Sequence, residues 1–146
     1  MIHGVIRVGQ VGMMAASSKA GKSWALLALA DAVACGLDWL GWKTTKGRVL
    51  YVNAELPRYD LQRRLERLAE ALGLDGIPEG LDVIHLRGTS KTIRELIPYV
   101  LRQQREVGPY ALILPDPLYA FGGGRDENSN REQAKTMAEL SEVAER

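Results

Sequence analysis

Eight residues near the start of the chain have the types and the spacing needed to hold a phosphate chain. They read Ala16-Ser17-Ser18-Lys19-Ala20-Gly21-Lys22-Ser23, which is the pattern G-x-x-x-x-G-K-[ST] with alanine at its first position. Such a site requires converging backbone N–H groups, a cation and a hydroxyl for Mg²⁺. Gly21 allows close backbone approach, Lys22 can reach the β and γ phosphates, and Ser23 can ligate Mg²⁺. These residues predict a P-loop that binds a nucleoside triphosphate.

The segments on either side of the loop fit a strand–loop–helix unit. Val11–Ala15 is a short apolar strand candidate, and the residues from about Lys22 to Cys35 have helical periodicity, with Gly36 placed to end the helix. The loop would therefore lead into a helix N-terminus, whose dipole favours anions. A chance turn of small residues is the alternative interpretation, and the flanking elements argue against it.

Two acidic residues lie where apolar segments end, and both have roles available in phosphate chemistry. Asp116 follows Ala111–Pro115 and reads as a Walker B aspartate, which holds Mg²⁺ through water or Ser23. The alternative is an ordinary turn aspartate between two prolines. Glu55 ends another apolar segment, and a carboxylate there can orient or deprotonate an attacking water. Its alternative role is to cap the helix that follows.

Apolar segments and helical patterns alternate along the rest of the chain. This alternation predicts an α/β fold, a parallel sheet with helices on both faces, as in three-layer P-loop NTPases. Pro98 lies within one helical pattern and should kink that helix or mark a late start. The expected strands are 48–55, 81–86 and 111–116, and the further helices are 61–72, 93–101 and 132–146.

The composition sets broad limits on the class of protein. The chain has 146 residues, 46% of them hydrophobic, which is enough for one domain with a core. A net charge of +1 indicates neither nucleic acid nor membrane as a partner, and a single cysteine excludes a disulfide framework. No segment has the length of a membrane helix, so we expect a cytoplasmic protein. His3 and His85 have no partners at metal-ligand spacing.

Taken together, four blocks of sequence resemble a known family. In order and spacing the chain is similar to the RecA-like AAA-type P-loop ATPases of phages and plasmids, such as the plasmid RepA-type hexameric replicative helicases. The resemblance covers nearly the whole chain. The blocks are Lys19–Trp24, Trp39–Gly41, Gly47–Glu55, and Asp116–Leu118 with Asp126–Asn128 after it.

The resemblance implies a role for each matching residue. Lys22 and Ser23 would be the phosphate and Mg²⁺ ligands, Glu55 the catalytic base and Asp116 the Walker B acid. It also implies ATP and Mg²⁺ as cofactors and a homo-oligomeric, hexameric ring. DNA as a partner rests on the resemblance alone, because no basic patch or stacking platform is visible. The expected nucleotide-binding residues are Ser17, Ser18, Lys19, Ala20, Gly21, Lys22, Ser23 and Trp24.

The chain departs from the family pattern at two positions and in its extent. Ala16 replaces a glycine, and Pro115 removes a ladder N–H before the aspartate. The family continues into a strand with a polar sensor residue and a segment with an arginine finger. We therefore expect residues 1–146 to be a single, partial RecA-like domain, truncated before that sensor strand, which would lie between the P-loop strand and the Walker B strand.

Several residues near the expected site have two open interpretations. Lys19 could add a second cation or be an exposed loop lysine, and Trp24 could lie near the base or pack in the core. Residues 119–131, with the glycines 122–124, read as a mobile loop near the γ-phosphate or as a plain connector. The resemblance implies a cis peptide after the Walker B aspartate, and Pro117 lowers the cost of that geometry. The alternative is a trans proline that ends the strand.

The leading function is Mg-dependent ATP hydrolysis as the N-terminal part of a motor, a ring helicase in DNA replication. One alternative is a P-loop small-molecule kinase, although such kinases need an arginine-rich lid. Another is a nucleotide-dependent switch or assembly module with little turnover.

Overall fold

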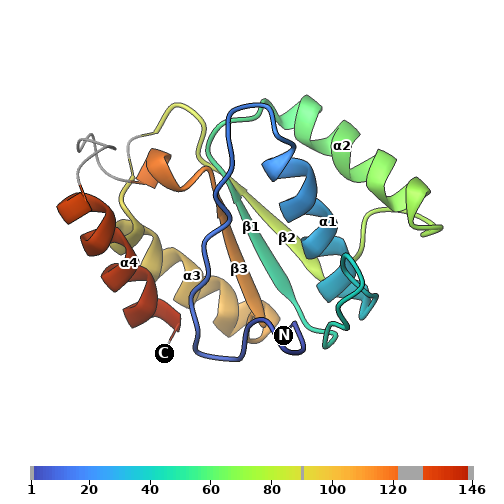
Figure 1. Ribbon diagram of the computed structural model, residues 1–146, viewed down its shortest axis with the longest axis horizontal. Helices are drawn as coiled ribbons and strands as arrows, with labels where there is room; N and C mark the ends of the chain where they lie inside the picture. The colour runs from blue at the N-terminus through green and yellow to red at the C-terminus, as the bar shows by residue number, and fades with distance from the viewer. Residues whose placement is uncertain (1, 90, 122–129, 145–146) are drawn as a thin grey trace.

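Three parallel strands lie between two layers of helices in the computed structural model, which describes residues 2–89, 91–121 and 130–144 (Figure 1). The strand order is β2-β1-β3. The expected α/β fold with a parallel sheet is confirmed. The elements are α1 (Lys22–Cys35), β1 (Val49–Asn53), α2 (Arg58–Ala71), β2 (Leu81–His85), α3 (Ile93–Val107), β3 (Leu112–Asp116), a 3₁₀ helix (Leu118–Phe121) and α4 (Asn130–Ala144).

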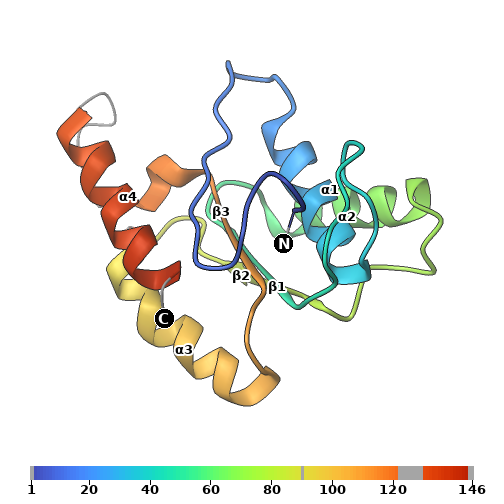
Figure 2. The same ribbon diagram turned by 60° about the horizontal axis from the view of Figure 1, so that its bottom comes forward.

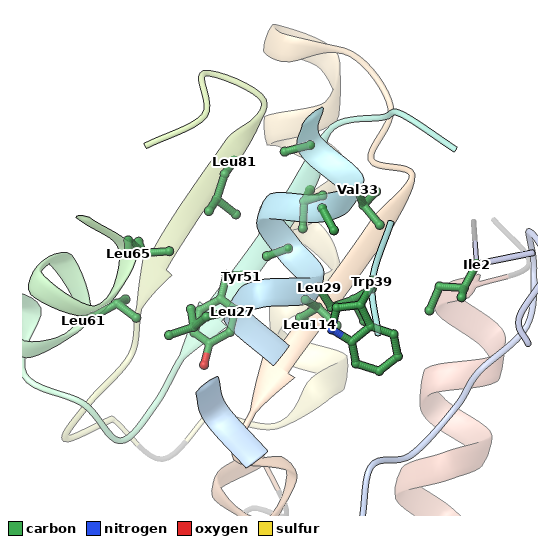
Figure 3. Packing of buried hydrophobic residues seen from close by; sticks show 14 residues of the cluster. Ile2, Leu27, Leu29, Val33, Trp39, Tyr51, Leu61, Leu65, Leu81 and Leu114 are labelled. Atoms are coloured by element: carbon green, nitrogen blue, oxygen red, sulfur yellow. The ribbon is translucent and has the colours of Figure 1, made fainter. Parts of the chain in front are cut away.

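The central strand β1 is apolar along most of its length because both of its faces are covered. All of its residues are buried. Val49 and Tyr51 belong to the cluster formed with α1 and α2, whereas Leu50 and Val52 belong to the cluster formed with α3. Since side chains alternate along a strand, this division gives the three-layer arrangement. Figure 3 shows the first cluster from close by.

The helix ends follow local sequence signals. Gly36 ends α1 in the left-handed conformation with φ of 76°, which favours glycine. Thr92 and Glu95 form a capping box at the start of α3, so each bonds the other's backbone N–H. Pro98 lies inside α3 near its start, so the helix begins before it, at Ile93.

The expected strand at Val11–Ala15 is wrong. Those residues form no strand, and Met13 has 61% of its surface exposed. A strand requires a partner for its backbone groups. The central strand β1 is paired on both edges by β2 and β3, and within the described ranges no strand lies beyond β3. The segment before α1 instead runs along the β3 side of the sheet (Figure 2).

Pro115 lies in a strand with one free edge, not in the middle of the sheet. It pairs with Val52 of β1, and β3 ends the sheet within the described residues. Proline is tolerated in edge strands where its nitrogen is on the side without a neighbouring strand, because no ladder hydrogen bond is then lost. The expected difficulty at this position therefore does not arise here.

One carboxyl group lies inside the core. Asp31, in the middle of α1, is fully buried, and neither carboxylate oxygen has a hydrogen-bond partner among the described residues. Burial raises the pKa of Asp31 from 3.8 to about 7, because desolvation disfavours the charged form. The folded chain therefore keeps a proton on Asp31 that the unfolded chain releases.

This buried carboxyl predicts a stability that falls as the pH rises. The folded pKa lies above the unfolded one, so the favourable contribution is complete below pH 3.8 and is lost as the pH rises through about 7. Replacing Asp31 by asparagine removes the ionisation at nearly constant volume. The difference in free energy of unfolding between Asp31→Asn and wild type should therefore increase, in favour of Asp31→Asn, by about 2–3 kcal/mol from pH 5 to pH 8.

Urea unfolding of both chains at the two pH values measures this gain. Asp38→Asn is the matched control, since Asp38 is an exposed aspartate in the turn after the same helix. A difference between wild type and Asp31→Asn that does not change with pH would contradict the assignment.

Candidate functional site

The P-loop residues lie at the edge of the sheet where the strands end. Gly21 precedes α1 in the left-handed conformation, with φ of 86°, a backbone state that side chains other than glycine disfavour. No side chain caps α1, and its first turn has no acidic residue. The first N–H groups of a helix have no partner within it, so these groups are available to an anion at the position that the sequence predicts.

The Lys22 ammonium is held by its own loop. Its Nζ donates to the carbonyl oxygens of Ala16, at 2.7 Å, and Ser17, at 2.8 Å. The ammonium is thereby folded back across the loop. Among the described non-glycine residues, Lys19 and Leu40 have a positive φ, and Ala16 does not. Alanine in place of the first glycine therefore causes no left-handed strain in this conformation.

The remaining loop residues are accessible. Ser17, Ser18, Lys19 and Ala20 are exposed, and Ser23 is half-buried in the first turn of α1. Lys19 is an exposed loop residue. Trp24 is 37% exposed and packs under Arg64 of α2, whose guanidinium carbon lies 5.1 Å from the centre of the indole ring. Of the two interpretations of Trp24, full burial in the core does not hold.

Asp116 is a buried carboxylate at the end of β3, not an exposed turn residue. It is 8% exposed, and the hydroxyl of Tyr51 donates a hydrogen bond to its Oδ2. The Asp116–Pro117 peptide is cis, as the resemblance implies. Tyr51 comes from β1, and Figure 3 shows its hydroxyl directed toward the edge where the strands end. The hydrogen bond holds one oxygen of the carboxylate.

Tyr51 and Arg64 are residues of this site that the sequence analysis missed. Burial, then the nearby Asp116 carboxylate and their hydrogen bond, raise the pKa of Tyr51 far above its usual value; Arg64 opposes this rise and Glu55 adds to it. The Tyr51 hydroxyl therefore stays protonated and lies within electrostatic reach of all three. The only signal for Tyr51 is a hydroxyl among the apolar residues Val49, Leu50 and Val52 of β1.

Glu55 lies two residues beyond the end of β1, and its side chain is exposed. Asn53 holds the turn: its Oδ1 accepts from the backbone N–H of Glu55, at 3.3 Å, and of Leu56, at 2.9 Å. The helix that follows has Pro57 at its N-cap and no side-chain cap. Glu55 therefore does not cap α2, which removes the alternative interpretation of this residue. The backbone N–H of Ala54 donates to the Asp116 carbonyl, so the two strand ends lie together.

The oxygen donors at this edge fit a hard divalent cation. The Asp116 Oδ1 atom is not occupied by the Tyr51 bond, and Ser23 contributes a hydroxyl. No group of three His, Cys, Asp or Glu side chains in the described part of the chain could hold a metal by itself. Mg²⁺ typically uses one or two carboxylates together with phosphate oxygens and water. The residues present therefore fit a magnesium ion that arrives with a nucleotide.

We expect Tyr51→Phe to weaken the response to Mg²⁺ more than the binding of nucleotide. Loss of the hydroxyl frees the Asp116 carboxylate to rotate, and removing such supporting hydrogen bonds typically weakens metal affinity by about 10–100-fold. The Mg²⁺ concentration for half-maximal ATP turnover should rise by this factor. Tyr59→Phe is the control, since Tyr59 is 74% exposed. Equal Mg²⁺ dependence in Tyr51→Phe and wild type would contradict this role.

Part of the segment after β3 differs from expectation. Leu118–Phe121 form a 3₁₀ helix, and Phe121 is buried in the cluster under α3. The expected loop of Gly122–Gly124, and the Asp126–Asn128 block of the resemblance, lie outside the described residues.

A three-layer parallel sheet with a P-loop before its first helix and a buried aspartate ending a strand defines an α/β P-loop nucleotide-binding domain. In agreement, a family model described as an AAA domain matches residues 1–146. The chain belongs to this family, and membership indicates a nucleotide-binding ATPase. Among curated proteins, none matches the chain. No helix in the described ranges is long and apolar enough to cross a membrane.

Proposed function

We propose that this chain binds ATP with Mg²⁺ at the P-loop and hydrolyses it, as the N-terminal part of a RecA-like motor. One observation carries the proposal: three features lie at the same edge of the sheet. They are the uncapped N-terminus of α1, the Lys22 ammonium bonded to its own loop, and the buried Asp116. The resemblance to RepA-type helicases supports a DNA-replication role and a hexameric ring. ATP, magnesium and DNA are the partners proposed.

Each residue has a defined task in the proposed reaction. Backbone N–H groups of the loop and the first turn of α1 bind the phosphate oxygens. Lys22 leaves the carbonyls of Ala16 and Ser17 and pairs with the β and γ phosphates, where it neutralises developing charge. Ser23 and Asp116 would hold Mg²⁺, which supplies further charge neutralisation when bound.

Glu55 is the proposed base. Its carboxylate takes a proton from the water whose oxygen attacks the γ-phosphorus, while the bond to the leaving β-phosphate oxygen breaks to give ADP and phosphate. Its exposed position beyond β1 leaves room for water beside it. The hydrogen bond from the Glu55 backbone N–H to the Asn53 side chain fixes the backbone of Glu55.

The test is to incubate the chain with ATP and Mg²⁺ and to quantify ADP and inorganic phosphate, with and without single-stranded DNA. We expect ADP and phosphate in equal amounts, formed faster when DNA is present. Transfer of the phosphoryl group to an added small molecule instead of water would establish the kinase alternative. Tight ATP binding without products would establish the switch alternative, and no ATP binding would contradict all three.

A further inference from the structure

A cavity lies at the same edge of the sheet, outside the P-loop. It has a volume of about 620 Å³ and opens between the turn after β1 and the end of β2. No residue of the P-loop lines it. Its lining residues are Leu56, Pro57, Arg58, His85, Arg87 and Gly88.

The polar side chains of this lining are cations and a neutral ring. Within the described residues, neither Arg58 nor Arg87 takes part in an ion pair, and the lining has no carboxylate. Arg58 is also the first residue of α2, a helix that no side chain caps. Guanidinium groups recognise phosphate and carboxylate with paired hydrogen bonds. The charge and the donors of this cavity thus favour an anion.

The hydrogen bonds of Asn53 settle the tautomer of His85. The amide oxygen of Asn53 accepts from two backbone N–H groups, and its Nδ2 donates to the Leu56 carbonyl at 2.7 Å. The same Nδ2 lies 3.1 Å from Nδ1 of His85. Since Nδ2 can only donate, the Nδ1 atom of His85 accepts, and the proton of the neutral ring is on Nε2.

The ring of His85 is kept neutral by its surroundings. Burial and the positive charge of Arg58 lower the pKa of His85. A neutral imidazole with its proton on Nε2 has one N–H left to donate, on a residue that lines the cavity. Together with the two guanidinium groups, this N–H makes a set of donors with no acceptor side chain among them.

We propose that the cavity lined by Arg58, His85 and Arg87 is a second anion site that binds a phosphate group, separate from the P-loop. The phosphate can be a free ion or a phosphodiester of a single-stranded nucleic acid. Asn53 bonds both His85 and the backbone of Glu55. An anion bound to His85 is therefore connected to the turn of Glu55 through a single residue, Asn53. Binding at this site does not depend on hydrolysis by the chain.

The test uses the two histidines of the chain as reporters. His3 bonds Thr45, which precedes β1, whereas the cavity follows the end of β1, so His3 lies at the other end of the strand and serves as an internal control. Adding inorganic phosphate is expected to shift the ring ¹⁵N signals of His85 and to leave those of His3 in place. The ring spectrum of the free chain should show the Nε2–H tautomer at His85.

Four variants separate this cavity from other anion sites. Arg87→Gln and Arg58→Gln are each expected to weaken the phosphate response of His85 by about tenfold or more. Arg63→Gln, an exposed arginine on α2 outside the cavity, should leave the response unchanged. Lys22→Ala should also leave it unchanged, since that variant disables the P-loop alone. Unchanged His3 signals show that each variant is folded.

The source of the phosphate is decided by a second titration with a short oligothymidylate. If the oligonucleotide shifts His85 at much lower phosphate concentration than the free ion does, the site takes a nucleic-acid backbone. The log–log salt slope should then fall by about 0.7 for each arginine removed. A response to the free ion alone supports an inorganic or small-molecule phosphate. No shift of His85 with either ligand, or loss of the shift in Lys22→Ala, would overturn the proposal.

Discussion

A Lys22→Ala chain is expected to lose ATP turnover and to bind ATP at least about 100-fold more weakly than wild type. The Lys22 ammonium makes two bonds to loop carbonyls, of Ala16 and Ser17, and it is placed to exchange them for phosphate oxygens. Hydrogen bonds between charged groups are worth about 1.5–3 kcal/mol each. Losing the cation removes several such bonds to the β and γ phosphates together.

Binding of a fluorescent ATP analogue, followed by measurement of phosphate release, tests this expectation. Lys43→Ala is the control, because Lys43 is an exposed lysine outside the loop. It should retain both binding and turnover. If affinity and hydrolysis were both unchanged in Lys22→Ala, the P-loop assignment would be wrong, whatever the other residues of the site do.

For Glu55→Gln we expect a different result, in which binding and chemistry separate. The substitution keeps the size of the side chain and removes its ability to accept a proton. Nucleotide affinity should stay within a few-fold of wild type, while kcat falls by about 10²–10⁴-fold, the usual contribution of a general base. The turn itself should be preserved, since Asn53 holds the backbone of Glu55 independently of its side chain.

Single-turnover measurement of ATP cleavage isolates the chemical step for this comparison. Glu70→Gln is the control, as Glu70 is an exposed glutamate of α2 in the last turn of that helix. Turnover near the wild-type rate in Glu55→Gln would show that another group activates the water. The structure has already excluded the other role considered for Glu55, because α2 begins after Pro57 with no side-chain cap.

Local features of the sequence were sufficient for the order of the elements and for most of their ends. The apolar runs at β1, β2 and β3 and the helical spacing of α1 through α4 predict the observed alternation. Such signals depend on neighbours within a turn or two of chain, which is why they can be read without a fold. The same holds for the P-loop, whose eight residues are contiguous.

The strand expected at Val11–Ala15 shows where local reasoning ends. An apolar run becomes a strand only if another strand offers hydrogen-bond partners beside it, and that depends on segments far away in the chain. β1 has β2 and β3 as its neighbours, and within the described residues Val11–Ala15 does not pair with the free edge of β3. The same dependence explains Pro115, whose cost could be judged only once β3 was known to have a free edge.

The sequence by itself determined which residues are proposed for the chemistry, because each lies in a motif that can be read locally: Lys22, Ser23, Glu55 and Asp116. Only the tertiary structure decided their surroundings. It placed the Tyr51 hydroxyl on Asp116, although 65 positions separate the two residues, and joined His85 to the turn of Glu55 through Asn53. Parallel pairing brings the ends of all three strands to one edge, and residues far apart in the chain meet there because their strands are aligned in register.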